Sequence, residues 1–305
     1  MVETADLSFT DALERRARSI EALLDRILRQ EPEAGETMRP KRLLDAMRHG
    51  VLNGGKRLRP FLVMESAALF GADNEAAERV AAALECIHCY SLIHDDLPAM
   101  DDDDLRRGQP TVHKAFDEAT AILAGDSLLT IAFDVVVAPE TELPPTAKVD
   151  LVSELARAAG IGGMVGGQAL DLAAEKKAPD EVGIITLQAM KTGALIRFAC
   201  EAGAIVAVAK PEDRERLAAF GSAVGLAFQL ADDLLDLTSD EQTLGKAAGK
   251  DVAAGKATLA ALHGPAWAQT QLFGLVEQAN ALLEPFGERA AMLREAAKFV
   301  AIRRS

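Results

Sequence analysis

The chain has 305 residues, of which 49% are apolar, so it can bury a large hydrophobic core without metals or disulfides. Its formal net charge of -14 at pH 7 argues against a general nucleic-acid binder, which would need a basic surface. Aromatic residues make up only 4%, and alanine and leucine fill long runs, which favours helices over strands. No composition break or long linker divides the chain, so we expect one domain over residues 1–305.

The N-terminal half is expected to begin with an amphipathic helix over residues 10–30, in which the apolar residues recur at helical spacing. These residues are Leu13, Ile20, Leu23, Leu24, Ile27 and Leu28. A second helix should end near Gly54, and Pro60 fits the first turn of a helix over 60–70. A long helix is expected over 74–95.

Further helices are expected where alanine and leucine continue between breaks rich in Pro, Gly and Asp. These helices cover 114–137, 147–172, 180–209, 211–238, 256–262 and 267–300. Four glycines should let neighbouring helices approach closely, with ligand contact as the alternative: Gly162, Gly163, Gly166 and Gly167. We find no alternating pattern typical of strands. The predicted fold class is all-α, a bundle of about ten or more helices.

The cysteines and the N-terminus indicate a compartment. The N-terminus lacks a basic segment followed by an apolar one, and no uncharged apolar run approaches the length of a membrane span. We therefore expect a cytoplasmic protein with reduced thiols and no stable membrane association. Cys86 and Cys89 form a CxxC pattern, but no second pair completes a zinc site, so together with Cys200 they are expected to be buried thiols.

The segment IHDDLPAMDDDDLRRG (93–108) carries six aspartates within ten residues. An acidic run alone is usually a solvated surface. This run, however, ends a strongly apolar helix, and Pro98 cannot continue that helix cleanly, so the chain should bulge there. The bulge would bring Asp101 back beside Asp95, whereas an ideal helix would place them about 240° apart.

A second acidic cluster lies in FQLADDLLDL (228–237). Asp232 and Asp236 are four positions apart, about 40° on a helix, so both carboxylates lie on one face. Like charges among leucines are unfavourable unless a cation neutralises them. Mg²⁺ suits bare carboxylates and keeps waters and phosphate oxygens as further ligands. Two such clusters, each ending an apolar helix, therefore predict metal sites.

Basic residues stand in a few discrete places. GGKRLRP (54–60) places its cations in a glycine-introduced turn at a helix start, where backbone N–H groups also favour anions, although a plain surface turn is an equal alternative. Arg106 and Arg107 follow the first aspartates, and Lys191 lies in a helix. LGKAAGKDVAAGK (244–256) follows the second aspartates. Each acidic cluster, which could bind metal ions, is followed by basic residues that could bind phosphate oxygens. The sequence therefore predicts two sites of the size of a diphosphate.

Several motifs of the sequence resemble those of one protein family. The motifs GGKRLRP, DDLPAMD with DLRRG, GGQALDL, KTG, FQLADDLLD and GKDVAAGKAT occur in order between residues 54 and 258. They are similar to those of the short-chain trans-isoprenyl diphosphate synthases, most of all to the bacterial farnesyl-producing members. The resemblance covers nearly the whole chain. It implies a single polyprenyl synthetase domain, a bundle around a deep central cavity (the isoprenoid synthase fold) and a homodimer.

The resemblance also implies an activity: the Mg²⁺-dependent condensation of isopentenyl diphosphate with dimethylallyl or geranyl diphosphate, giving farnesyl diphosphate and pyrophosphate. The resemblance implies three magnesium ions per active site. Their ligands would be Asp95, Asp96, Asp101, Asp232 and Asp236. The allylic diphosphate would be held by Arg106, Lys191 and Lys246, with Lys256 nearby. Isopentenyl diphosphate would be held by Lys56, Arg59, His88 and Arg107.

Other positions match the family less completely. Thr192 and Gln229 resemble the dipoles that stabilise an allylic cation, but Leu195 stands where some members have a tyrosine. Tyr90, with Ser91 beside it, resembles the aromatic floor that stops the product at C15; five residues of helix before Asp95 span about 7.5 Å. The tail arginines, Arg303 and Arg304, are candidates for closing the site.

Three alternatives remain open. A geranylgeranyl diphosphate synthase would make a C20 product from the same motifs. A non-catalytic subunit that regulates a prenyl synthase would be expected to have lost one aspartate motif, and both are intact here. Terpene cyclases share the cation chemistry, but GGKRLRP and the second aspartate motif fit chain elongation better.

Overall fold

The computed structural model of the chain describes residues 8–243 and 258–302. In these residues almost all secondary structure is helical, and the strands are two short ones, β1 Leu105–Arg106 and β2 Gln109–Pro110. The predicted all-α fold class is confirmed. The chain divides into two compact units, one formed by residues 1–67 and 72–152 and the other by residues 68–71 and 153–305.

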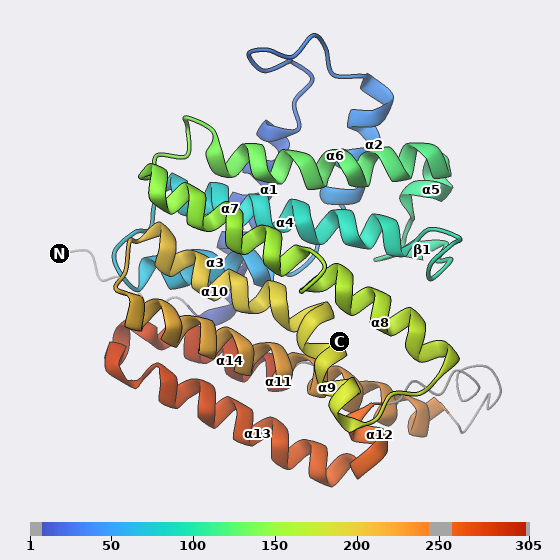
Figure 1. Cartoon of the computed structure of the whole chain (residues 1–305), viewed down its shortest axis with the longest axis vertical. Helices are drawn as coiled ribbons and strands as arrows, with labels where there is room; N and C mark the ends of the chain where they lie inside the picture. Colours follow the sequence, from blue (N-terminus) through green and yellow to red (C-terminus); the bar gives the residue numbers. More distant parts are fainter. Residues whose placement is uncertain (1–7, 244–257, 303–305) are drawn as a thin grey trace. The chain divides into compact units, whose positions relative to one another are not determined.

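The first unit is built around a long buried helix. Its helices are α1 Phe9–Ile27, α2 Lys41–Val51, α3 Leu58–Ala68, α4 Glu75–Asp95, α5 Val112–Ala115 and α6 Glu118–Val137. The apolar stripe predicted for the first helix is buried in α1. Helix α4 is buried on nearly all sides, as is typical of a core helix, and α6 lies alongside it (Figure 1). The end of α4 therefore brings the first aspartates directly out of the core.

The second unit is organised around α11. Its elements are α8 Met164–Lys176, α9 Glu181–Gln188, a π-helical segment η1 Ala189–Gly193, α10 Ala194–Val206, α11 Pro211–Thr243, α12 Leu259–His263, α13 Pro265–Leu282, a 3₁₀ segment η2 Glu284–Ala290 and α14 Ala291–Ile302. Helix α7 Pro145–Ala159 contributes residues to both units. Helix α11 packs against α10, α13, α14 and η1, so the second aspartate cluster also starts from a packed helix.

Three of the predicted helices are wrong in extent, because each contains a break. The helix expected over 114–137 divides where the Asp117 side chain accepts a hydrogen bond from the Thr120 N–H (2.7 Å) and caps α6. The helix expected over 147–172 divides at the glycine-rich turn before α8. The one expected over 267–300 divides at η2, where Gly287 has a φ of 57° that a helix does not allow.

The glycine-rich segment gives a mixed outcome. A Cβ at Gly167 would overlap the backbone of Lys191 in η1, and one at Gly166 would meet the Met190 side chain. Close packing of α8 on η1 is therefore confirmed for Gly167, whereas Gly166 lies closest to the Ile161 backbone of the preceding turn. Gly162 and Gly163 instead lie in the turn between α7 and α8, where Gly162 has no neighbour close enough to require a glycine.

Two of the described helices, Glu118–Val137 and Pro211–Leu237, are long and apolar enough to cross a membrane by length and composition. Both contain acidic residues, such as Asp126 and Asp232, so the expectation of no uncharged run still holds. Core helices of globular proteins meet the same criterion, and 61% of the apolar window in the second helix is buried. These helices are therefore weak evidence for a membrane span.

Candidate active site

The first aspartate cluster begins where α4 ends. Asp95 is the last residue of the helix, and the backbone N–H of Asp101 donates to the Asp95 carbonyl oxygen at 2.8 Å. The N–H of Asp102 donates to the Leu97 carbonyl, and Asp102 has a φ of 53°. The predicted return of the chain after Pro98 is thus confirmed for the backbone. Asp95 is half-buried and Asp101 is exposed.

Asp96 has a different environment from its neighbour Asp95. It is buried, and its carboxylate accepts hydrogen bonds from Nε (2.8 and 3.0 Å) and Nη2 (2.5 Å) of Arg106. Burial raises the pKa of Asp96, and the guanidinium opposes this shift. The two side chains neutralise each other in this structure. Their roles as magnesium ligand and diphosphate-binding residue stay predictions.

The adjacent arginines lie in different parts of a β-hairpin whose turn has two residues. β1 pairs with β2 in the register Arg106↔Gln109, and the connecting residues Arg107 and Gly108 have φ values of 52° and 75°. Positive φ at both positions is typical of a type I′ turn. As a result Arg106 reaches Asp96, whereas Nη1 of Arg107 donates to Oδ1 of Asn53 (3.1 Å) and to the Gly54 carbonyl.

Arg107 thereby joins the basic turn before α3. Gly55 has a φ of 124°, and a Cβ there would overlap the Arg107 guanidinium, so this position requires glycine. Within the turn Lys56 is exposed and Arg57 is buried, and Arg59, in the first turn of α3, is half-buried. The structure therefore places Arg107 on the turn that carries Lys56 and Arg59.

His88 lies on α4 within the electrostatic influence of the same cations. Burial holds its pKa well below the ordinary value, and the charges of Arg59 and Arg107 lower the pKa further. An imidazole in such a place is neutral and can donate or accept one hydrogen bond at each nitrogen according to its tautomer. The structure thus brings Arg59 and Arg107 within electrostatic reach of His88. Lys56, the fourth residue predicted to hold isopentenyl diphosphate, lies in the turn that Arg107 contacts.

Tyr90 is buried in the first unit, with 5% of its surface exposed. Its ring meets the His94 ring edge to face at 5.8 Å between centroids, and Nε2 of His94 lies 3.1 Å from the Ile122 carbonyl of α6. Burial and the charge of Asp95 raise the pKa of Tyr90 to about 12, so the phenol stays neutral. Ser91 donates to the His88 carbonyl within α4 (2.9 Å).

In the second unit, Lys191 and Thr192 lie in the π-helical segment η1. Such segments are rare and occur frequently at functional sites. Nζ of Lys191 is 2.5 Å from Oδ2 of Asp171 on α8. Asp171 belongs to the GGQALDL motif, and no role was predicted for it from the sequence. The pair lies on different helices, so no spacing in the sequence indicates it.

The second aspartate cluster lies on α11, with Asp232 half-buried and Asp236 exposed. Asp233 is buried, and its Oδ2 accepts from Nε2 of Gln188 at 3.0 Å. Burial raises the pKa of Asp233 to about 6; the Gln188 hydrogen bond opposes the shift, and the charges of Asp232 and Asp236 add to it. Asp233 is therefore a buried anchor, which leaves its two acidic neighbours nearer the surface.

The donor set fits magnesium ions that retain other ligands. Among the described residues, no group of three or more His, Cys, Asp or Glu side chains already forms a cage for a metal ion. Mg²⁺ does not need one, since it is usually bound through one or two carboxylates together with waters and substrate phosphates. Asp95 and Asp101 in one unit, and Asp232 and Asp236 in the other, provide such carboxylates.

The structure describes only some of the remaining residues that were predicted to belong to the site. Lys246, Lys256, Arg303 and Arg304 lie outside the described residues. Gln229 and Thr192 are half-buried, and Leu195 is fully buried, so it offers no polar contact to a substrate. All three cysteines are buried and free, as expected. Burial raises the thiol pKa of both CxxC cysteines, for Cys89 to about 12, which keeps these thiols protonated.

The comparisons with known proteins agree with this arrangement. The sequence profile of the polyprenyl synthetase family matches residues 40–293. The chain is 47% identical to the farnesyl diphosphate synthase of Escherichia coli (strain K12), over 81% of this chain and 84% of that one. It is 40% identical to geranylgeranyl pyrophosphate synthase 9 of Arabidopsis thaliana, over 95% of this chain and 80% of that one.

A crystal structure of an FPP/GFPP synthase from Zymomonas mobilis in its apo form is also similar, with 45% identity and a TM-score of 0.85. The match covers 96% of this chain and 98% of that one. The chain belongs to the polyprenyl synthetase family of prenyltransferases.

Proposed function

We propose that the chain condenses isopentenyl diphosphate with dimethylallyl or geranyl diphosphate to give farnesyl diphosphate and pyrophosphate. The observation that carries this proposal is that each unit holds an aspartate cluster with its own cations. Asp95 and Asp101 share the first unit with Arg106, and Asp232 lies on α11, against which the segment carrying Lys191 packs. Similarity to enzymes named farnesyl diphosphate synthase supports the choice of reaction.

Magnesium bound at the aspartates would supply Lewis-acid neutralisation of the departing pyrophosphate. The residues that we assign as its ligands are Asp95, Asp96, Asp101, Asp232 and Asp236. Arg106 and Lys191 bind the oxygens of the allylic diphosphate, with Lys246 and Lys256 in the same role. For Arg106 and Lys191 this means exchanging a carboxylate partner, Asp96 or Asp171, for the substrate.

Isopentenyl diphosphate is bound by Lys56, Arg59, His88 and Arg107. Thr192 and Gln229 present oxygen dipoles to the allylic cation, which is where charge develops in the reaction. The double bond of isopentenyl diphosphate attacks this cation, and the proton that is lost passes to the pyrophosphate. Water has to be excluded while the cation exists, because it would quench the cation to an alcohol.

Tyr90 is proposed to limit the product to C15, because its buried ring lies one to two helical turns before Asp95 on α4. The alternative product is the C20 geranylgeranyl diphosphate, and the similarity to an Arabidopsis geranylgeranyl pyrophosphate synthase supports keeping it. We also propose a cytoplasmic homodimer without stable membrane association. The exposed apolar residues Ile122, Leu123 and Val137 of α6 support a partner on this helix, and light scattering of the purified protein tests it.

The deciding experiment supplies purified protein with Mg²⁺, geranyl diphosphate and labelled isopentenyl diphosphate, and identifies the product by mass spectrometry. We expect a C15 diphosphate, and no turnover when EDTA removes the metal. Feeding farnesyl diphosphate tests the alternative: efficient formation of C20 would favour the geranylgeranyl enzyme. An absence of turnover with every allylic starter would favour a non-catalytic subunit and contradict the proposal.

A further inference from the structure

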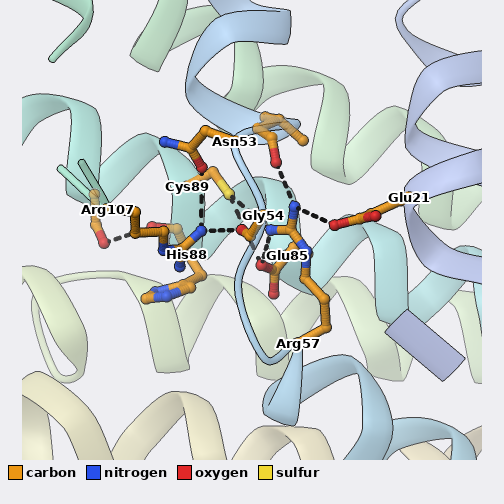
Figure 2. Close-up of polar contacts among 10 residues, drawn as sticks. Glu21, Asn53, Gly54, Arg57, Glu85, His88, Cys89 and Arg107 are labelled. Carbon is orange, nitrogen blue, oxygen red and sulfur yellow. Dashed lines mark hydrogen bonds and ion pairs between the residues drawn. The ribbon is translucent and has the colours of Figure 1, made fainter. Parts of the chain in front are cut away.

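Arg57 is a fully buried cation in the middle of the basic turn. Its side chain has 0% exposure, and that of its partner Glu85 on α4 has 2%. Nη1 of Arg57 lies 2.6 Å from Oε1 of Glu85 (Figure 2). Burial of a charged pair is unfavourable unless its geometry and further hydrogen bonds compensate for lost hydration. A buried ion pair that joins a short turn to α4 therefore requires an explanation beyond general stability.

The Arg57 guanidinium connects the turn to several helices. Nη2 donates to the Val51 carbonyl at the end of α2 (2.6 Å) and to Oε1 of Glu21 on α1 (3.4 Å). Together with the Glu85 contact on α4, these bonds use the fork of donors that only arginine has. Lysine would offer a single point charge in this position.

The same turn is held from its other side by Arg107, which donates to Asn53 and Gly54. Arg57 has a φ of 49°, which is uncommon for a residue other than glycine and is kept only where surrounding contacts determine it. Lys56 precedes Arg57 directly, and Arg59 follows two positions later. The buried guanidinium thus sets where both neighbouring cations emerge.

We propose that Arg57 and Glu85 are a positioning pair, which fixes the turn over residues 53–57 so that Lys56 and Arg59 hold the diphosphate of isopentenyl diphosphate. The inference rests on the proposed function. Arg57 itself touches no substrate. Its contribution is to the affinity for isopentenyl diphosphate, with little effect on the allylic substrate.

The test compares Arg57→Met with the double variant Arg57→Met/Glu85→Met in the full chain. The single variant leaves Glu85 buried without its partner and should lower the melting temperature. The double variant replaces the pair by apolar residues and should recover it. If the pair positions the turn, KM for isopentenyl diphosphate should stay raised by about 10- to 100-fold in both variants. KM for geranyl diphosphate should change by less than about twofold.

A matched control is the Arg16–Glu65 ion pair, which joins α1 to α3 in the same unit at 2.9 Å. Arg16→Met/Glu65→Met should leave KM for isopentenyl diphosphate unchanged. Calorimetric titration of isopentenyl diphosphate without an allylic substrate gives a readout that does not depend on turnover.

Recovery of both the melting temperature and the isopentenyl diphosphate affinity in the Arg57→Met/Glu85→Met variant would overturn the inference, since the pair would then be structural only. An equal loss of affinity in the Arg16 control would overturn it as well. Failure of the unmodified chain to bind isopentenyl diphosphate or to condense it would refute the proposed function itself, and is seen before any variant is compared.

Discussion

Neighbouring residues in the aspartate and arginine motifs have different environments, and this difference supports different proposed roles for them. Asp95 is half-buried at the end of α4, while Asp96 turns inward to the Arg106 guanidinium. Arg106 lies in β1 and Arg107 in the hairpin turn that follows, so one contacts the acidic cluster and the other the basic turn. A motif read as a block of like charges therefore contains residues with separate partners.

His88 gives a pH prediction at the residue scale. Its pKa in the folded chain lies well below the 6.5 of a free imidazole, chiefly because of burial. Below pH 6.5 the unfolded chain takes up a proton that the folded chain does not. The contribution of His88 to stability is therefore present above that pH and lost as the pH falls. We expect His88→Gln to weaken this loss, by at most about 1.4 kcal/mol per pH unit, in denaturant unfolding of the metal-free protein. If the free energy of unfolding depended on pH in the same way in both proteins, this expectation would be contradicted.

Tyr90 gives a prediction of product length. Tyr90→Ala removes a buried ring and should extend the main product from C15 to C20, as measured by mass spectrometry. Tyr90→Phe keeps the ring and loses only the neutral hydroxyl, so its product should stay at C15. A C15 product from Tyr90→Ala would show that the ring only packs in the core, where its loss costs about 3–5 kcal/mol of stability.

At the scale of elements, glycines determine how closely helices approach. In the first unit the His94 imidazole lies over Gly125 of α6, and in the second unit Gly167 of α8 faces the backbone of η1. In both places a glycine lets another helix approach closely: His94, next to the predicted site residues of α4, packs on Gly125, and Lys191 packs on Gly167. Small residues at these positions therefore allow the close packing of residues in or near the predicted site.

Two identical substitutions should have opposite effects. A Cβ at Gly125 would overlap the His94 imidazole, so Gly125→Ala should lower the free energy of unfolding by about 1–3 kcal/mol. Gly274 in α13 has nothing within 4 Å of such a Cβ, so Gly274→Ala should raise it by about 0.5–1 kcal/mol through helix propensity. Urea unfolding measures both.

Placing Gly125→Ala in a His94→Ala background identifies the cause, because the added methyl group then has room. We expect the cost of the glycine substitution to disappear there. If the cost persists, the clash with His94 is not its source.

At the scale of the whole molecule, a chain with a net charge of -14 is expected to act on anionic substrates. Its overall field is unfavourable for them, so local cations and bound metal ions have to provide the attraction. In the described residues, cations lie close to predicted site carboxylates: Arg106 contacts Asp96, and Lys191 contacts Asp171. Under the proposed function, a diphosphate would replace these carboxylates as the partner of each cation.

If both aspartate motifs serve one chemical step, their loss should not be additive. We expect Asp95→Asn and Asp232→Asn each to lower kcat by about 10³-fold or more, and the double variant to lower it little further. Asp45, a half-buried residue of α2 that pairs with Lys41, provides the control, and Asp45→Asn should leave kcat unchanged. Full multiplication of the two single losses would instead indicate independent contributions.

The class of fold, most helix starts and the placement of the first aspartate motif at a helix end could be predicted from the sequence, because these depend on local features. The second motif was expected to end its helix, but α11 continues past it to Thr243. Apolar spacing predicted the buried stripe of α1, and Pro98 predicted the return of Asp101 to the Asp95 backbone. The breaks before α6, before α8 and at η2 were missed, since a cap or a glycine can end a helix or be tolerated inside one.

The partners of the site residues were decided only by the tertiary structure. Nothing in the spacing of the sequence indicates that Arg57 pairs with Glu85, that Asp171 pairs with Lys191, or that Gln188 supports Asp233. Each pair joins side chains from different helices, and such contacts depend on how the helices pack. Local sequence thus specified which charges are present and on which helices, whereas packing specified which of them are buried and paired.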